Sequence, residues 1–159
     1  MMGERSLQES RAQESRVHGL SGPDIAREAM QRGLNCCESV LTAANEVWNL
    51  NLSSDMFFAA KLFKEGMGNG CTCGALVGIV LASGVIRERY GLPEDEDLAK
   101  RLHSSFKQEY KSSCCAVLRK KQSFFDRISK KGCIRVTEGA TAILVKEWEN
   151  LHPLKEKIT

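Results

Sequence analysis

The seven cysteines of this 159-residue chain fall into four places, and each place has the pattern of a helix N-terminus. In each, a residue type that commonly caps helices stands directly before the cysteines. The four places are Asn35 with Cys36 and Cys37, Thr72 with Cys73 (Cys71 lies just upstream), Ser113 with Cys114 and Cys115, and Gly132 with Cys133. Because a helix N-terminus carries unpaired N–H groups and partial positive charge, a thiol held there ionises easily and becomes a nucleophile or metal ligand. The pattern predicts a helical protein with redox or metal chemistry.

Apolar residues recur at helical spacing along most of the chain, without a hairpin or strand pattern. Asn35 and Glu38 form a capping box. Turn residues divide the pattern into helices at 24–32, 36–48, 55–64, 73–89, 94–110, 114–121 and 133–150, with a less regular segment at 123–131. We therefore expect an all-α protein, a compact antiparallel bundle of about five to seven helices with cysteines at helix N-termini.

Three regions are expected along the chain. Residues 1–20 are polar and lack the apolar core of a secretory signal, so they predict a disordered leader. Residues 21–152 would form one helical domain of redox type, and residues 153–159 a C-terminal tail. The most apolar run, 75–86, is shorter than the roughly 20 residues that span a bilayer, so no membrane insertion is expected. A cytoplasmic location follows, where cysteine clusters more often indicate redox or metal chemistry than structural disulfides.

The charge of the chain limits its partners. A net charge of +3 is too small to indicate a nucleic-acid partner. Lysines and arginines do gather in one segment, at Arg119, Lys120, Lys121, Arg127, Lys130 and Lys131. We interpret this cluster as a solvated helical face, with a surface for anions or an acidic partner as the alternative.

The helix predicted at 73–89 is apolar on nearly every side, so we expect it at the centre of the bundle. Gly74 and Gly78 share one of its faces and each costs roughly 1 kcal/mol of helix propensity, so a close approach by another group is expected there. The phenylalanines at Phe57, Phe58 and Phe63 are expected in the core. A homodimer is a further expectation for a chain of this size with such a helix.

Short connections favour antiparallel neighbours, so the four helices that begin at cysteines would start at one end of the bundle. Their thiols would then share an electropositive pocket, with the glycine-rich loop 66–70 at its rim. Cys73 is the expected nucleophile because the glycines around it leave room for an approaching sulfur. Its expected partners are Cys36, Cys115 and Cys133.

At least two of the seven cysteines are expected to be inert. Neighbouring residues lie about 3.8 Å apart at Cα, which is too close for an unstrained disulfide, so one member of each doublet suffices. Cys37 and Cys114, or Cys71 in place of Cys114, would pack as small apolar residues. Cys71 in its loop could alternatively act as a resolving thiol.

Three functions are compatible with this pattern. The first is a thiol-based redox protein, an oxidoreductase using Cys36, Cys73, Cys115 and Cys133 for thiol–disulfide exchange or electron transfer with an unidentified redox partner. The second is a metal-binding protein that holds zinc or an iron–sulfur cluster on the same four cysteines, although the tight Cys-x-x-Cys pairs typical of such sites are absent from the sequence. The third is a non-catalytic helical interaction module.

An ordered series of motifs also resembles a known family. The motifs are Asn35-Cys36 followed by Ser39-Val40-Leu41, then Gly66-Met67-Gly68, Cys73-Gly74-Ala75-x-x-Gly78, Cys115-x-x-Leu118 and Cys133-x-x-Val136-x-x-x-Ala140. Over residues 23–150 the chain resembles the small bacterial and archaeal proteins of suspected redox activity named for their C…GCAxxG…C…C pattern. The resemblance implies a redox role carried by Cys36, Cys73, Cys115 and Cys133. Cys37, Cys71 and Cys114 are additions to the family pattern.

Overall fold

The computed structural model describes residues 19–156, with side chains described as far as Asn150. The predicted leader, residues 1–20, lies outside this range except for its last two residues. The α-helices of the described range are α2 (Gly22–Gln31), α3 (Cys36–Val47), α4 (Ser54–Ala60), α5 (Gly74–Arg89), α6 (Leu98–Tyr110), α7 (Cys115–Lys120), α8 (Phe124–Ile128) and α9 (Lys131–Glu156). A 3₁₀ turn (Lys61–Phe63) and a π-type turn (Gly66–Gly70) connect α4 to α5.

The predicted all-α class is confirmed, because residues 19–156 contain one isolated β-bridge but no strand. The described range holds eight α-helices, one more than the upper end of the expected number. The irregular segment at 123–131 accounts for the difference. The Ser123 side chain accepts the Asp126 N–H at 3.1 Å, and this cap closes a short helix, α8.

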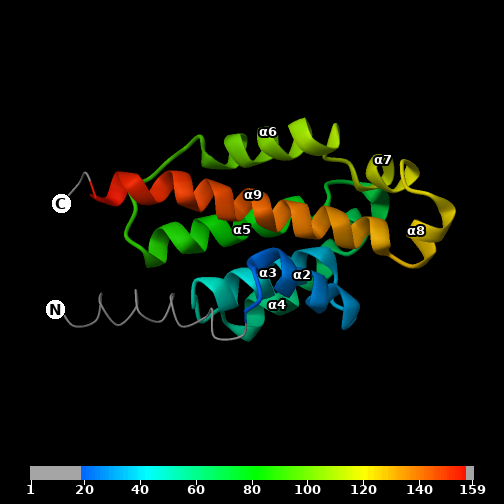
Figure 1. The fold of residues 1–159 in the computed structure, drawn as a ribbon, viewed down its shortest axis with the longest axis horizontal. Helices are drawn as coiled ribbons and strands as arrows, with labels where there is room; N and C mark the ends of the chain where they lie inside the picture. The colour runs from blue at the N-terminus through cyan, green and yellow to red at the C-terminus, as the bar shows by residue number, and fades with distance from the viewer. Residues whose placement is uncertain (1–18, 157–159) are drawn as a thin grey trace.

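The helices that carry the cysteines run in the same direction. α3 packs against α5, and both contact α9 (Figure 1). α2 covers α3 and α9 on one side, while α6 lies against α5 and α9 on the other. All three central helices begin at the end of the bundle where α7 and α8 lie (Figure 1). The predicted gathering of helix starts at one end is therefore found; we call this region the thiol end.

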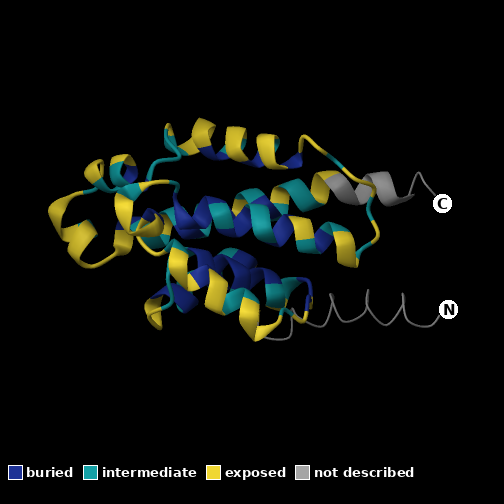
Figure 2. Cartoon of the chain, turned by 180° about the vertical axis from the view of Figure 1, so that it is seen from behind, coloured by how far each residue is buried: buried dark blue, intermediate teal, exposed yellow. Residues whose placement is uncertain are grey.

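One main core fills the space between these helices. Most of its fully buried side chains come from α3, α5, α6 and α9 and include Leu41, Ile79, Leu102, Phe106 and Leu144. Figure 2 shows the buried residues concentrated in the central helices, whereas α8 is mostly exposed. Among the described residues, no helix is both long and apolar enough to traverse a bilayer.

Two glycines bring α3 and α5 into close contact. A Cβ added at Gly78 would lie 2.8 Å from the Cβ of Val40, and one at Gly74 would lie 2.7 Å from Cys36 Sγ. Both distances are shorter than real side chains allow, so only glycine permits this approach. The close contact predicted for this glycine face is thus confirmed, and the partner is α3.

Several helix boundaries differ from the prediction, and those of α6 and α9 are among the larger differences. α6 begins at Leu98 rather than at residue 94, because Asp95 organises a local turn: its carboxylate accepts the Asp97 N–H at 3.1 Å and binds Arg101 at 2.6 Å. α9 begins at Lys131 and continues to Glu156, so Pro153 does not end it.

The prediction of a phenylalanine core group is wrong at one position. Phe57 and Phe63 pack partly buried against the main core. Phe58 is 60% exposed, and the ammonium of Lys61 lies 4.9 Å from its ring centroid. α4 is too short and too peripheral to bury two successive aromatic side chains on opposite faces.

Candidate functional site

The four cysteines predicted to act together line one small pocket at the thiol end. Cys36, Cys73, Cys115 and Cys133 contribute to its wall, together with Leu118, Arg119, Gln122, Val136 and Thr137. The cavity volume is about 20 Å³, enough for a single water-sized group. Cysteines almost 100 positions apart in sequence therefore meet at one end of the bundle, as the predicted helix directions indicated.

Cys36 is positioned by the predicted capping box. The Asn35 side chain accepts the Glu38 N–H at 3.0 Å, and the Glu38 carboxylate accepts the Asn35 N–H at 2.9 Å. The Asn35 amide also donates to the carbonyls of Ala60 and Lys61, at 3.2 and 3.3 Å. These bonds fix the start of α3 against the end of α4. Cys36 follows the cap as the first residue of α3.

Cys73 and Cys115 are brought together by a β-bridge that the sequence pattern did not predict. The Cys73 N–H donates to the Ser113 carbonyl at 2.8 Å, and the Cys115 N–H donates to the Cys71 carbonyl at 2.6 Å. Thr72 and Cys114 face each other in this antiparallel bridge. The segments before α5 and α7 are consequently held side by side.

The bridge also changes which residues cap the helices. Because the segments around Thr72 and Ser113 are used in the bridge, neither residue caps a helix, contrary to prediction. Cys73 itself occupies the N-cap position of α5, and Cys114 that of α7. Gly132 is likewise the second residue of α9 rather than its cap, which places Cys133 third in the helix. All four pocket cysteines still lie in or next to a first helical turn.

The glycine-rich turn supports the pocket from behind. Gly66, Met67, Gly68 and Gly70 all have positive φ. A Cβ at Gly66 would lie 2.6 Å from the Cys71 nitrogen and 2.8 Å from Cys115 Cβ. The turn therefore packs against Cys115 but contributes no residue to the pocket wall, so the expectation that it forms the rim is wrong.

The Cys36 and Cys73 thiols form an asymmetric pair. A hydrogen bond from the Cys36 thiol lowers the pKa of Cys73, and the N–H groups of Ala75 and Leu76 in the first turn of α5 add to this lowering. The same hydrogen bond, followed by burial, raises the pKa of Cys36 well above its ordinary value. The pair thus favours a thiolate on Cys73 and a proton on Cys36.

The other two pocket thiols are held in the protonated form. Burial raises the pKa of Cys115 to about 11. Burial is also the main cause that raises the pKa of Cys133, against smaller lowering effects from Gln122 and Arg119. Among the four thiols that line the pocket, Cys73 is the one whose pKa is lowered, which agrees with its predicted role as nucleophile.

The three additional cysteines differ from one another. Cys37 is completely buried and its pKa is raised to about 12 by burial, which matches the expected core role. Cys114 is only partly buried, and its thiol donates to the Gly70 carbonyl at 3.1 Å. It ties α7 to the glycine-rich turn instead of packing in the core. Cys71 is exposed.

Two pocket residues were not anticipated from the sequence. The Gln122 amide nitrogen lies 4.0 Å from Cys133 Sγ, while its buried oxygen has no hydrogen-bond partner among the described residues. Arg119 borders the pocket and is paired with Glu65 at 3.6 Å. No sequence signal identifies either residue, because their roles depend on where α7 lies relative to α9.

The thiols do not form a metal site as they are arranged. Within the part of the chain that the structure describes, no group of three or more His, Cys, Asp and Glu side chains is placed to hold a metal ion. The four pocket cysteines remain the residues that would hold a zinc ion or an iron–sulfur cluster.

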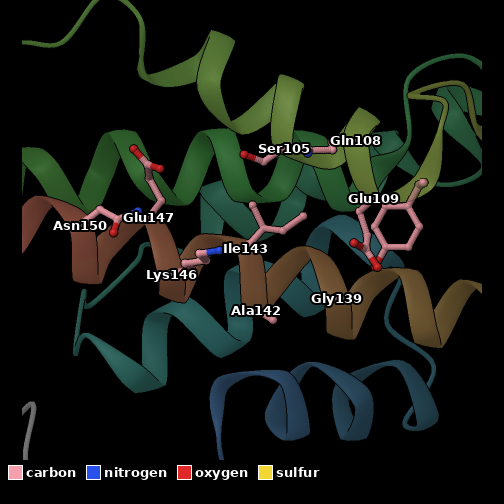
Figure 3. Close-up of a pocket in the computed structure, with 10 residues that line it drawn as sticks. Ser105, Gln108, Glu109, Gly139, Ala142, Ile143, Lys146, Glu147 and Asn150 are labelled. Carbon is pink, nitrogen blue, oxygen red and sulfur yellow. The ribbon is translucent and has the colours of Figure 1, made fainter.

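Another cavity, of about 570 Å³, lies between α6 and α9 (Figure 3). Its lining residues are Ser105, Gln108, Glu109, Tyr110, Gly139, Ala142, Ile143, Lys146, Glu147 and Asn150. A Cβ added at Gly139 would collide with the Tyr110 hydroxyl, so a side chain at position 139 would require Tyr110 to move. Burial raises the pKa of this tyrosine to about 12. No cysteine lines this cavity, so it is separate from the thiol pocket.

Fold and site together define an all-α protein with a shared pocket of four cysteines. The family model described as "Putative redox-active protein (C_GCAxxG_C_C)" matches residues 34–147, more than two thirds of the chain. This protein therefore belongs to that family, as the motif series indicated. No curated protein and no solved structure matches the chain significantly.

Proposed function

We propose that this protein is a thiol–disulfide redox protein in which Cys73 is the nucleophile and Cys36 the resolving thiol. The observation that carries the proposal is that Cys36 and Cys73 line one pocket, where the neighbouring Cys36 thiol lowers the pKa of Cys73. Thiolates are the nucleophiles of disulfide exchange, and a second thiol within reach resolves the mixed disulfide.

The exchange runs in two steps. The Cys73 thiolate attacks one sulfur of a substrate disulfide, forming a mixed disulfide and releasing the first substrate sulfur as a thiolate. Cys36 then loses its proton and attacks the Cys73 sulfur, forming a Cys36–Cys73 disulfide and releasing the second substrate sulfur. Two electrons pass from the protein dithiol to the substrate, whose two sulfurs leave as thiols.

The electrostatics of the pocket favour this order of events. The largest cause of the raised Cys36 pKa is its hydrogen bond to Cys73. When Cys73 enters a mixed disulfide, its negative charge disappears and this cause is removed. The Cys36 pKa consequently falls at the stage when Cys36 must become a nucleophile.

Cys115 and Cys133 supply two further thiols in the same wall. Their raised pKa values keep them protonated near neutral pH, so they do not compete with Cys73 for the first attack. In this scheme Cys115 loses its proton and attacks the Cys36–Cys73 disulfide, and Cys133 resolves the mixed disulfide, so that a Cys115–Cys133 disulfide forms and the first pair returns to its dithiol form.

The test uses 4,4′-dithiodipyridine as the disulfide substrate in a Cys71→Ser background, which removes the exposed thiol. Two pyridinethiones are expected from the Cys36–Cys73 pair, the second when Cys36 closes the internal bond. Cys73→Ser should abolish the fast phase, and Cys36→Ser should preserve the first release but trap the mixed disulfide on Cys73, as seen by peptide mass spectrometry.

Two results would overturn the proposal. A fast phase of unchanged rate in Cys73→Ser would remove Cys73 as nucleophile and favour a non-catalytic interaction module. Stoichiometric zinc or iron in anaerobically purified protein, lost in Cys73→Ser, would instead establish metal binding on the same cysteines.

A further inference from the structure

The segment that closes the thiol pocket has an inner and an outer side of different character. Between residues 115 and 133, the side chains that line the pocket belong to Cys115, Leu118, Arg119, Gln122 and Cys133. Exposed residues stand between them in sequence, and several of these are large and apolar. α7 thus contributes residues to the pocket wall and exposes others to solvent, whereas α8 contributes none to the wall and is mostly exposed (Figure 2).

The outer side exposes a concentration of apolar side chains. Phe124 is 62% exposed, Phe125 81% and Ile128 66%, and Val117 of the neighbouring α7 is also exposed. None of the five residues of α8 is buried. Exposed aromatic and aliphatic groups gathered on one short segment mark interaction surfaces in folded proteins. We call the outer side of residues 117–131 the α7–α8 surface.

The same surface is strongly basic. Residues 117–131 contain six lysines and arginines and a single acidic residue, Asp126, so their formal charge is +5. Since the whole chain carries +3, the rest of the chain carries −2. Asp126 is itself bound to Arg135 at 2.8 Å. The alternative role of the basic cluster, an acidic-partner surface, therefore gains support from the apolar residues exposed among the cations.

The thiol pocket is too small to enclose a substrate. Its volume of about 20 Å³ holds a single atom-sized group, so only the reacting sulfur of a larger molecule would enter. The remainder of that molecule must lie against the surface next to the pocket. At this end of the bundle, α7 and α8 are the helices that provide it (Figure 1).

We propose that the α7–α8 surface docks an acidic protein whose disulfide or thiol reaches the cysteine pocket. The docking follows from the exposed apolar groups and the charge; the delivery of a disulfide or thiol rests on the function proposed above. Aromatic residues surrounded by cations are typical anchors of protein interfaces, and charge complementarity selects an acidic partner.

Three other binding partners fit the α7–α8 surface less well: a second copy of the chain, a membrane and single-stranded nucleic acid. A symmetric contact with a second copy would place two surfaces of the same sign against each other. α8 has five residues, which is short for a helix that lies in a membrane interface. Phe124 and Phe125 meet at 77° in a T-shaped contact, so their rings do not form the parallel platform on which single-stranded bases stack.

The test measures binding by fluorescence anisotropy with a labelled synthetic peptide in which glutamate alternates with leucine and phenylalanine. The peptide should bind the full chain, and its affinity should fall when the salt concentration is raised from about 0.15 M to about 0.5 M. Arg127→Glu combined with Lys131→Glu should weaken binding about tenfold or more, and Phe125→Ser by a similar factor. A peptide with lysine in place of glutamate should not bind.

Matched variants outside the surface serve as controls. Lys146→Glu and Phe58→Ser change an exposed cation and an exposed aromatic residue elsewhere, and both should bind the acidic peptide as the wild type does. Cys73→Ser should also bind normally, since docking does not require the nucleophile. Absence of disulfide exchange in the wild-type protein, together with intact peptide binding, would overturn the proposed function without affecting the docking proposal.

Three results would overturn the docking proposal. One is the absence of peptide binding, or binding that none of the α7–α8 variants weakens. Another is tighter binding, through the same residues, to vesicles containing phosphatidylglycerol or to a single-stranded oligonucleotide. The last is a concentration-dependent dimer in sedimentation that Phe125→Ser dissociates, which would assign the surface to a second copy of the chain.

Discussion

The two ends of the bundle are built on different principles. At the end opposite the thiols, Trp148 lies between Trp48 and Tyr90 in edge-to-face contacts, with ring centroids 6.1 and 4.7 Å apart. The Tyr90 hydroxyl donates to the Trp48 carbonyl at 3.2 Å. Arg101 adds ion pairs to Asp95 and Glu147 at 2.6 and 2.8 Å. Large side chains and charge pairs close this end, which we call the aromatic end.

At the thiol end, by contrast, glycines, turns and a single β-bridge bring the chain segments together. Gly66, Gly74 and Gly78 stand where any side chain would collide with a neighbour. The thiol end exposes its apolar groups on α8, whereas the aromatic end buries or half-buries them. The comparison indicates that large packed side chains are concentrated at one end, which leaves the other end free to gather the four thiols in one small pocket.

The largest effect on stability is expected from Trp48→Ala at the aromatic end. Trp48 is almost fully buried, and its removal should lower the free energy of unfolding by about 3–5 kcal/mol. Chemical denaturation followed by circular dichroism measures this loss. The fast reaction of the thiol pocket with dithiodipyridine should be retained under native conditions. A variant that loses both stability and thiol reactivity together would show that the two ends are not independent.

Alkaline pH should destabilise the protein through the thiol end. Burial raises the pKa of Cys37 from 9.0 to about 12, so the unfolded chain releases this proton before the folded one does. Stability is therefore complete below pH 9 and is lost as the pH rises toward 12, by roughly 2–3 kcal/mol near pH 11 for this group. Denaturant unfolding between about pH 7 and pH 11 tests the trend. Cys37→Ala should flatten it, and an equally steep decline in that variant would contradict the assignment.

A smaller effect is expected from the glycine contact between α3 and α5. Gly78→Ala would force its new methyl group against Val40 and should cost about 1–3 kcal/mol. Gly84 in the same helix provides the matched control, because nothing lies within 4 Å of a Cβ added there. Gly84→Ala should stabilise the helix by about 0.5–1 kcal/mol. Equal effects of the two substitutions in thermal unfolding would show that α3 does not approach α5 at Gly78.

Local sequence signals were sufficient for the helices and for the direction in which they run. The capping box at Asn35 and the spacing of apolar residues depend on neighbours a few positions away, so they are visible in the sequence. Short connections then fix which helix starts lie together, and this brought Cys36, Cys73, Cys115 and Cys133 to one end.

The details of the pocket depend on contacts between segments distant in sequence, so they could not be predicted from the sequence. The bridge between Thr72 and Cys114 joins two short stretches without any strand pattern, and it moves the N-cap from Thr72 to Cys73. Gln122 reaches Cys133 only because α8 turns the chain back toward α9. The Asp95–Arg101 ion pair, with which α6 starts later than predicted, likewise could not be predicted from the sequence, because several neighbouring acidic residues could have formed it.

The most direct measurement of the account is the pH profile of Cys73 alkylation by iodoacetamide, read by mass spectrometry in wild type and in Cys36→Ala. We expect the wild-type midpoint below 9, the ordinary thiol value. Cys36→Ala should raise the midpoint, since it removes the largest cause of the lowered pKa, while Cys36→Ser retains a hydroxyl donor and should raise it less. A wild-type midpoint at or above the ordinary thiol value, or one that Cys36→Ala leaves unchanged, would contradict the pairing on which the proposed chemistry depends.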